Sequence, residues 1–180
     1  MLSVSDITQY LNERIASVIP NAKTYGIAKQ AAIGDKTMPY CDGAYIGVDD
    51  TYPIQAYHKQ LSIASVPVVA RSGYGDSEGY MQNTYGMAII IYFDEKKLQI
   101  AVDELYTVIQ SQISGIIKAE GFKSIRIAVN NAILNDEQVW RQEYGNVKFP
   151  LSGSQRLIQI GYSVQATLDK KCVVIKVCNN

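Results

Sequence analysis

The sequence is short of the side chains on which most enzymes, metal proteins and nucleic-acid-binding proteins depend. Its 180 residues include one histidine and only three cysteines, too few and too widely spread for a disulfide framework. Because an odd number of cysteines cannot all pair within one chain, we expect a reducing compartment. Lysine plus arginine and aspartate plus glutamate each total 17, so the chain lacks the basic excess that phosphate contacts require. Sequence-specific DNA binding is therefore not expected.

Long apolar runs are missing as well. Residues 1–20 contain Asp6, Glu13 and Arg14 and no continuous apolar core, so we expect no signal peptide. No stretch approaches the length of a membrane span, which takes about 20 apolar residues. The sequence thus predicts a soluble protein, made and used in a cytoplasm, with no membrane partner.

The composition is that of one ordinary globular domain. An apolar fraction of 47% and a charged fraction of 19% lie far from those of disordered proteins. A chain of 180 residues can bury a hydrophobic core without disulfides or metals, so we predict a single domain over residues 1–180. The formal net charge of zero does little to keep copies apart, which suits a protein that works inside an assembly.

No pattern of residues predicts a catalytic, metal or cofactor site. The single histidine, His58, has no cysteine or carboxylate beside it at metal-ligand spacing, so zinc is not expected. The segment 72–79 has the glycines of a phosphate loop but lacks its Gly-Lys-Ser/Thr ending. A nucleophilic pair of His58 with a cysteine stays open, although no known signature surrounds any cysteine. The cysteines are Cys41, Cys172 and Cys178. We predict that the protein is not an enzyme and binds no cofactor.

Adjacent acidic residues are better explained by local structure than by catalysis. Sequence neighbours do not face each other on a strand or a helix, so they make poor general acid–base pairs. Solvated turns and helix caps account for such residues. The pairs are Asp49 with Asp50 and Asp94 with Glu95. Asp136 with Glu137 is a small charge cluster at the end of an element, and we expect it to be solvated.

An amphipathic helix is predicted at the N-terminus. Its apolar residues recur at spacings of three and four, which places them on one face. Ser3 and Asp6 mark its start and Pro20 its stop. The apolar positions are Ile7, Leu11, Ile15 and Val18. Because the polar face is mixed rather than basic, we expect this helix to pack on a sheet.

Residues 22–69 carry short runs suited to strands, interrupted by glycine and proline. The clearest runs are 44–48 and 61–69. Pro67 indicates that the second of these ends at a sheet edge or a bulge.

Residues 71–86 combine four glycines with three tyrosines and almost no aliphatic side chains. This composition predicts a long flexible loop. Long loops in compact domains are often functional, and tyrosine with glycine makes contact surface at modest entropic cost. The segment is either a partner-binding arm, with Tyr74, Tyr80 and Tyr85 as candidate contacts, or the passive tip of a hairpin.

The middle of the chain predicts a strand, a helix and a second strand. Residues 87–93 are apolar on both faces, as in a central strand, and Asp94 can cap a helix that begins near Glu95. The apolar stripe of this helix continues to Ile116, with Gly121 as the stop. Alternation over 125–129 gives the second strand.

The last predicted elements are a short helical turn or an irregular crossing around Trp140, within residues 130–144, and a long strand over 156–168. Polar residues alternate with apolar ones along this strand, and Gln159 and Gln165 on its polar side are candidate partner contacts. The whole pattern predicts an α+β fold: a mainly antiparallel sheet with two main helices packed on one face, a long loop, and a C-terminal extension at 170–180. The other face of the sheet is expected to meet solvent or a neighbour.

This order of elements resembles the tail-terminator and tail-completion proteins of the head-to-tail neck of tailed bacteriophages. The stretch from Leu157 to Cys172, LIQIGYSVQATLDKKC, is similar to their closing strand. The resemblance spans most of the chain but is one of pattern, without a diagnostic motif, so it assigns no role to any single residue.

The resemblance implies a virion protein, assembled in the host cytoplasm, that forms a ring, commonly of six copies. Such a ring stops growth of the tail tube and joins it to the portal or connector, while DNA passes through its channel without specific contacts. An alternative is a small enzyme or ligand-binding protein with an apolar pocket between helices and sheet, indicated by His58 and a cysteine meeting at one cavity. Another virion component, such as a different neck protein or a capsid decoration, is a third possibility.

Overall fold

The computed structural model describes residues 3–33, 36–41, 43–46, 52–70, 78–118, 122–144, 151 and 153–168. These residues form four helices and two sheets, which confirms the predicted α+β class. In chain order the elements are α1 (Val4–Val18), β1 (Ala22–Ile27), β2 (Lys29–Ile33), β3 (Lys36–Cys41), β4 (Ala44–Tyr45), β5 (Ile54–Ala70), β6 (Glu78–Asp94), α2 (Glu95–Leu98), α3 (Val102–Ile113), β7 (Gly115–Ile117), β8 (Phe122–Ile133), α4 (Asp136–Tyr144) and β9 (Gln155–Leu168).

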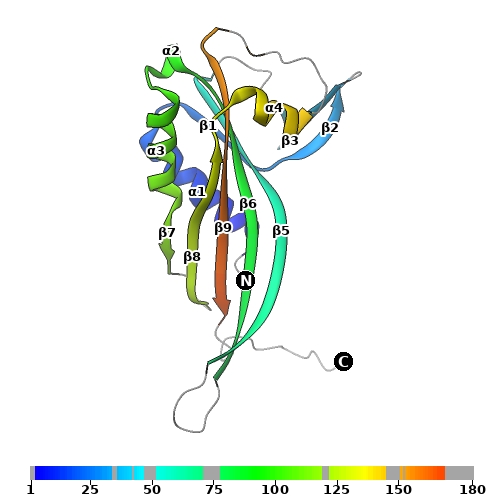
Figure 1. Cartoon of the computed structure of the whole chain (residues 1–180), viewed down its shortest axis with the longest axis vertical. Coiled ribbons are helices and arrows are strands. Elements are labelled where there is room, and N and C mark those ends of the chain that lie inside the picture. The colour runs from blue at the N-terminus through cyan, green and yellow to red at the C-terminus, as the bar shows by residue number, and fades with distance from the viewer. Residues whose placement is uncertain are drawn as a thin grey trace.

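The large sheet has the strand order β1-β5-β6-β9-β8-β7, and β2, β3 and β4 form the small one. Within the described residues of the large sheet, β1 runs parallel to β5 and the other neighbours are antiparallel. The mainly antiparallel sheet is thus confirmed. The two longest strands, β5 and β6, form a hairpin that extends past the ends of β8 and β9 (Figure 1).

Helices α1 and α3 pack on one face of the large sheet, as the sequence predicts. Their apolar stripes meet the inward side chains of β5, β6, β8 and β9 in one continuous core. The buried apolar residues of the two helices are Ile7, Leu11, Ile15, Leu105, Ile109 and Ile113. Helix α1 begins with a capping box, in which the Asp6 N–H donates to the Ser3 hydroxyl and the Ser3 N–H donates to the Asp6 carboxylate. It ends at Val18, just before Pro20.

Among the described residues, α4 and the small sheet cover the opposite face of the sheet at one end only (Figure 1). The prediction that this whole face meets solvent or a neighbour is therefore wrong for the covered end. The reason lies in strands that carry apolar side chains on both faces there. Ile90 and Tyr92 of β6 and Leu157 of β9 point away from α1 and α3 and are buried against Trp140 of α4.

The largest error concerns residues 71–86, for which the sequence predicts a loop. Residues 78–86 belong to β6 and pair with β5, whereas 71–77 lie outside the described residues. Glycine has a different role here than in a turn. A Cβ on Gly86 would come within 2.4 Å of Ser62 Oγ, so glycine permits the close approach of the two strands at the register shift between Gln60 and Ser62.

Strand boundaries also differ from prediction in residues 22–69. Strand β5 continues through Pro67, which pairs with Met81, and ends at Ala70. The proline is accommodated because β1 pairs only with the first part of β5, so no described strand needs the missing N–H on the far side. The strand predicted over 44–48 is reduced to Ala44–Tyr45, with 47–48 outside the described residues.

The helix predicted from Glu95 to Ile116 is two helices followed by a strand. Asp94 caps the first, as expected, but Gln99 takes a left-handed φ of 55° and ends it. Helix α3 ends at Ile113, and the φ of 153° at Gly115 turns the chain into β7, which contains Ile116. The expected stop at Gly121 lies outside the described residues.

Candidate functional site

The three tyrosines predicted as contacts do not come together in the described structure. Tyr74 lies outside the described residues. Tyr80 belongs to β6, where its backbone is opposite Val68 of β5. Tyr85 is partly buried and packs against the core beneath α1 and α3. A role for any of them in binding a partner stays a prediction.

The two predicted glutamines lie on the face of β9 that points away from α1 and α3. Gln159 is partly buried near the end covered by α4, opposite Ile90 and Ile133. Gln165 is exposed at the uncovered end, between Thr84 and Arg126 on the neighbouring strands. Of the five predicted residues, Gln165 has the most accessible described side chain.

His58 is fully buried and holds helix α1 against the sheet. Its Nε2 lies 2.9 Å from Asn12 Oδ1, which can only accept, so Nε2 carries the proton. Its Nδ1 therefore accepts from the Tyr162 hydroxyl at 2.7 Å. The Asn12 amide completes the chain by donating to the Tyr25 carbonyl at 2.8 Å. Burial lowers the pKa of His58 to about 3, so the imidazole is neutral at physiological pH.

A groove of about 590 Å³ runs between α1 and the neighbouring strands β1 and β3, lined by residues that include Thr8, Asn12, Thr24 and Cys41. The alternative function requires His58 and a cysteine at one apolar cavity. Cys41 lines this groove, but His58 lies behind Asn12 and does not. The groove is lined mainly by polar side chains, whereas the space between the helices and the large sheet is filled by core residues. Cys172 and Cys178 lie outside the described residues.

A second buried polar group lies beneath α4. Lys59 donates to Glu143 Oε1 at 2.8 Å, and the Glu143 side chain is only 3% exposed. The hydroxyls of Tyr92 and Tyr144 share a hydrogen bond, and burial raises the pKa of both phenols. Tyr57 OH and Glu143 Oε2 are buried without a hydrogen-bond partner among the described residues. Because all of these groups pack between β5, β6 and α4, they fix that helix on the sheet.

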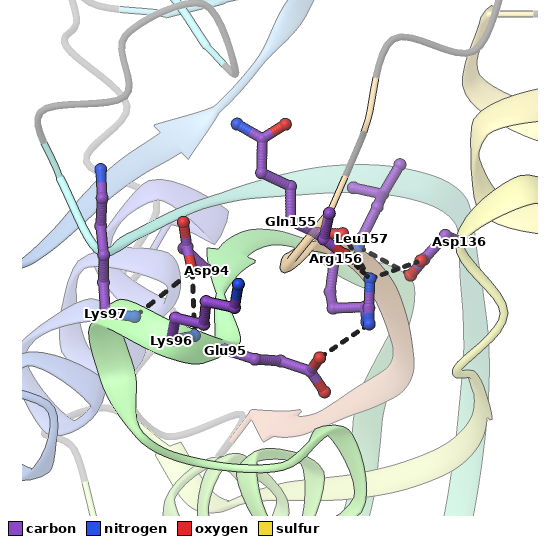
Figure 2. Close-up of polar contacts among 9 residues, drawn as sticks. Asp94, Glu95, Lys96, Lys97, Asp136, Gln155, Arg156 and Leu157 are labelled. Carbon is purple, nitrogen blue, oxygen red and sulfur yellow. Dashed lines mark hydrogen bonds and ion pairs between the residues drawn. The ribbon is translucent and has the colours of Figure 1, made fainter.

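A third polar group joins the ends of three elements around Arg156 (Figure 2). The Arg156 guanidinium lies 2.8 Å from Glu95 Oε2 and 3.9 Å from Asp136 Oδ2, and it donates to the Gly153 carbonyl at 3.0 Å. Asp136 also accepts from the Leu157 N–H at 3.0 Å. Asp94 thus serves as a helix cap, as the sequence predicts, whereas Glu95 and Asp136 are partly buried ion-pair partners of Arg156, which the sequence does not predict.

We expect Arg156→Met to lower the free energy of unfolding by about 1–2 kcal/mol, because two partly buried carboxylates lose their cation. Arg141→Met is the matched control. Its ion pair with Glu137 is exposed on α4, and such pairs contribute about 0.5 kcal/mol or less. Urea denaturation of both variants measures the difference. Equal losses would show that Arg156 is no more than a surface charge.

None of these polar groups forms a metal site: the described residues contain no cluster of three or more histidine, cysteine, aspartate or glutamate side chains that could hold an ion. No protein-family model and no curated protein matches the sequence. Function must therefore be inferred from the chain itself. None of the helices in the described ranges combines the length and apolarity needed to cross a bilayer.

The uncovered end of the large sheet carries exposed apolar side chains and strand edges that the packing of the core does not account for. Strand β1 pairs with β5 only as far as His58, so the rest of that edge has no described partner strand. Leu61 and Ile63 on this edge are 56% and 63% exposed. At the opposite edge, Ile116 of β7 is 71% exposed. Open edges with apolar side chains are sites where further strands add, so this end of the sheet is the candidate functional surface.

Proposed function

We propose that this protein is a structural virion protein of a tailed bacteriophage, which forms a ring at the head-to-tail neck. The ring ends the tail tube and joins it to the portal or connector. Its partners are other copies of itself, six in a ring by the implied family arrangement, together with the tube and portal proteins. The role of each copy is to bind its neighbours rather than to catalyse a reaction.

The observation that carries this proposal is the open, partly apolar end of the large sheet. Compact single-domain proteins usually blunt their sheet edges with charge, bulges or a covering segment. Here the described part of the β5 edge beyond Gln60 has the uncharged sequence Leu61 to Ala64, and the side chains of all four residues are exposed. An edge of this kind is stabilised when a further strand pairs with it, which favours an assembling protein.

Two further properties agree with this function. The uncovered sheet face at this end carries mostly uncharged polar side chains, among them Thr84, Ser163 and Gln165, with Arg126 as the charged exception. A surface of this kind offers few phosphate contacts, as non-specific passage of DNA requires. The zero formal net charge leaves little repulsion between copies.

Light scattering coupled to size-exclusion chromatography, across a concentration series, tests the proposal. We expect a ring-sized mass, or a monomer that converts to such a mass as concentration rises. Electron microscopy of that fraction should then show closed rings with a channel wide enough for duplex DNA. A particle without a channel would contradict the neck function. So would a monomer that stays monomeric when the tail-tube and portal proteins of its virus are added.

A further inference from the structure

The two open edges of the large sheet lie at the same level along the strands. The register across the sheet runs from Ile116 to Arg126, Gln165, Thr84 and Ala64, each residue directly opposite the next. Ile116 is on β7 and Ala64 is on β5, and these strands form the two sides of the sheet at this level (Figure 1). Two copies placed side by side, without a shift along the strands, therefore bring the β7 edge of one opposite the open β5 edge of the other.

The strand directions also agree. Every step from β5 through β6, β9 and β8 to β7 is antiparallel, so β5 and β7 run in the same direction. Gly115 and Ile117 share their rows with Ile63 and Ser65, in the same order along the two strands. An added β7 strand would therefore pair in parallel with β5 and continue the sheet without reversing it.

The open stretch on β5 is bounded at both ends. On one side β1 already occupies the edge, up to the pairing of Ile27 with His58. On the other side Pro67 has no N–H to offer to a new strand. Between them lies a stretch that matches the short strand β7, and its centre is at Ile63 and Ala64.

The two edges leave room for each other's side chains and carry no charges that would repel. A groove of about 400 Å³ lies at the β7 edge, lined by residues that include Gln110, Gly115 and Ile116. A Cβ built on Gly115 meets no atom within 4 Å, so the place beside the groove is open to a side chain such as Ile63 of a neighbour. The exposed cations near β7 are Lys118 and Arg126, and residues 61–64 of β5 carry no charge that would repel them.

We propose that β7 of one copy adds in parallel to residues 63–65 of β5 in a second copy, and that repetition of this contact closes the ring. The inference deepens the proposed function and rests on it for the ring. Because the two edges differ, the contact is head-to-tail, which closes into a ring when the rotation between copies permits. The twist of the sheet supplies a rotation of constant sign at each contact. Three paired residues a side is far below the 20–30 of a standard interface, so we expect single contacts to be weak and the closed ring to be favoured.

Cysteine cross-linking tests the register directly. Neighbouring strands lie about 4.8 Å apart, within the range of Cα separations that a disulfide spans. Ala64→Cys and Ile116→Cys chains, each also carrying Cys172→Ser and Cys178→Ser, are mixed and mildly oxidised. We expect heterodimers from the mixture, few homodimers from either chain alone, and a ladder ending at the closed ring from the double variant. The control pairs Ala64→Cys with Leu134→Cys, because Leu134 is also exposed but follows the residue opposite Gln159, about 20 Å along the sheet from Gln165.

A charge at the edge gives an independent readout. Ile116→Lys places a cation on a side chain that is 71% exposed, so folding should be unaffected while the ring-sized mass is lost. Leu134→Lys should leave the ring intact. If wild-type rings form but the Ala64–Ile116 pair does not cross-link and Ile116→Lys still assembles, the edge contact is wrong and the proposed function stands. If the wild type does not assemble at any concentration and the Ala64→Cys and Ile116→Cys chains do not cross-link, the edge contact is wrong and the proposed function loses its principal support as well.

Discussion

Between pH 8 and pH 5, the free energy of unfolding should fall by about 2 kcal/mol through His58 alone. In the unfolded chain a histidine titrates near 6.5, whereas burial lowers the pKa of His58 in the folded protein to about 3. Below pH 6.5 the unfolded state therefore binds a proton that the folded state does not. This stabilises the unfolded state by about 1.4 kcal/mol per pH unit, until the folded protein itself becomes protonated near pH 3.

Urea denaturation at several pH values measures this effect, and His58→Gln is the control. The glutamine amide can donate to Asn12 and accept from Tyr162, as the imidazole does, but it does not titrate in this range. The wild type should lose about 2 kcal/mol more than the variant between pH 8 and pH 5. Parallel pH profiles for the two proteins would show that His58 is not held neutral in the fold.

Asn12→Asp provides a second variant in case His58→Gln does not fold. A carboxylate at 2.9 Å from Nε2 favours the protonated imidazole, so the loss of stability between pH 8 and pH 5 should become smaller. The variant also loses the bond from the Asn12 amide to the Tyr25 carbonyl, so it should be less stable at pH 8.

Local patterns predict those elements whose environment is uniform along their length. Helix α1 follows from its apolar spacing and from Ser3 and Asp6, which form the capping box. Strand β9 follows from strict alternation, because one of its faces is buried along the core. The apolar run at residues 87–93 correctly indicates a central strand, since the core on one face and α4 on the other bury both of its sides.

The uncovered end of the sheet could not be predicted in the same way. Residues 78–86 are stabilised by pairing with β5 and β9, which come from other parts of the sequence, and not by a buried apolar pattern of their own. Judged from its sequence neighbours, Gly86 predicts a turn, although in the structure it permits close contact between β6 and Ser62 of β5. Ile116 and Ala64 lie in the same row across the sheet because of the registers of four successive strand pairs. No pattern in the sequence predicts these registers.

The polar groups are hidden from sequence for a related reason. His58, Asn12 and Tyr162 come from three distant segments, and nothing in the flanking residues of each indicates that they meet. Only His58 stood out, as the single histidine. Because His58 is buried, its imidazole is not a metal ligand or a catalytic base but a neutral side chain that joins α1 to the sheet.

Lys59→Met should lower the free energy of unfolding by about 2 kcal/mol at pH 7, through the charge that it leaves on Glu143. The Glu143 side chain is 3% exposed, and its Oε2 has no hydrogen-bond partner among the described residues. Without Lys59 the carboxylate is a buried charge without its cation. Breaking a fully buried pair costs about 3–5 kcal/mol. The Lys59 side chain is 37% exposed, so we expect a smaller loss of about 2 kcal/mol.

The reverse substitution should cost less, and this asymmetry identifies the mechanism. In Glu143→Leu the Lys59 amine can turn to solvent and the buried acceptor is gone, so we expect a loss of about 1 kcal/mol or less. The double variant Lys59→Met with Glu143→Leu should then be more stable than Lys59→Met alone, which a double-mutant cycle by urea denaturation measures. Equal losses from the two single substitutions would mean that water reaches Glu143. The group beneath α4 would then be a surface ion pair and not a buried one.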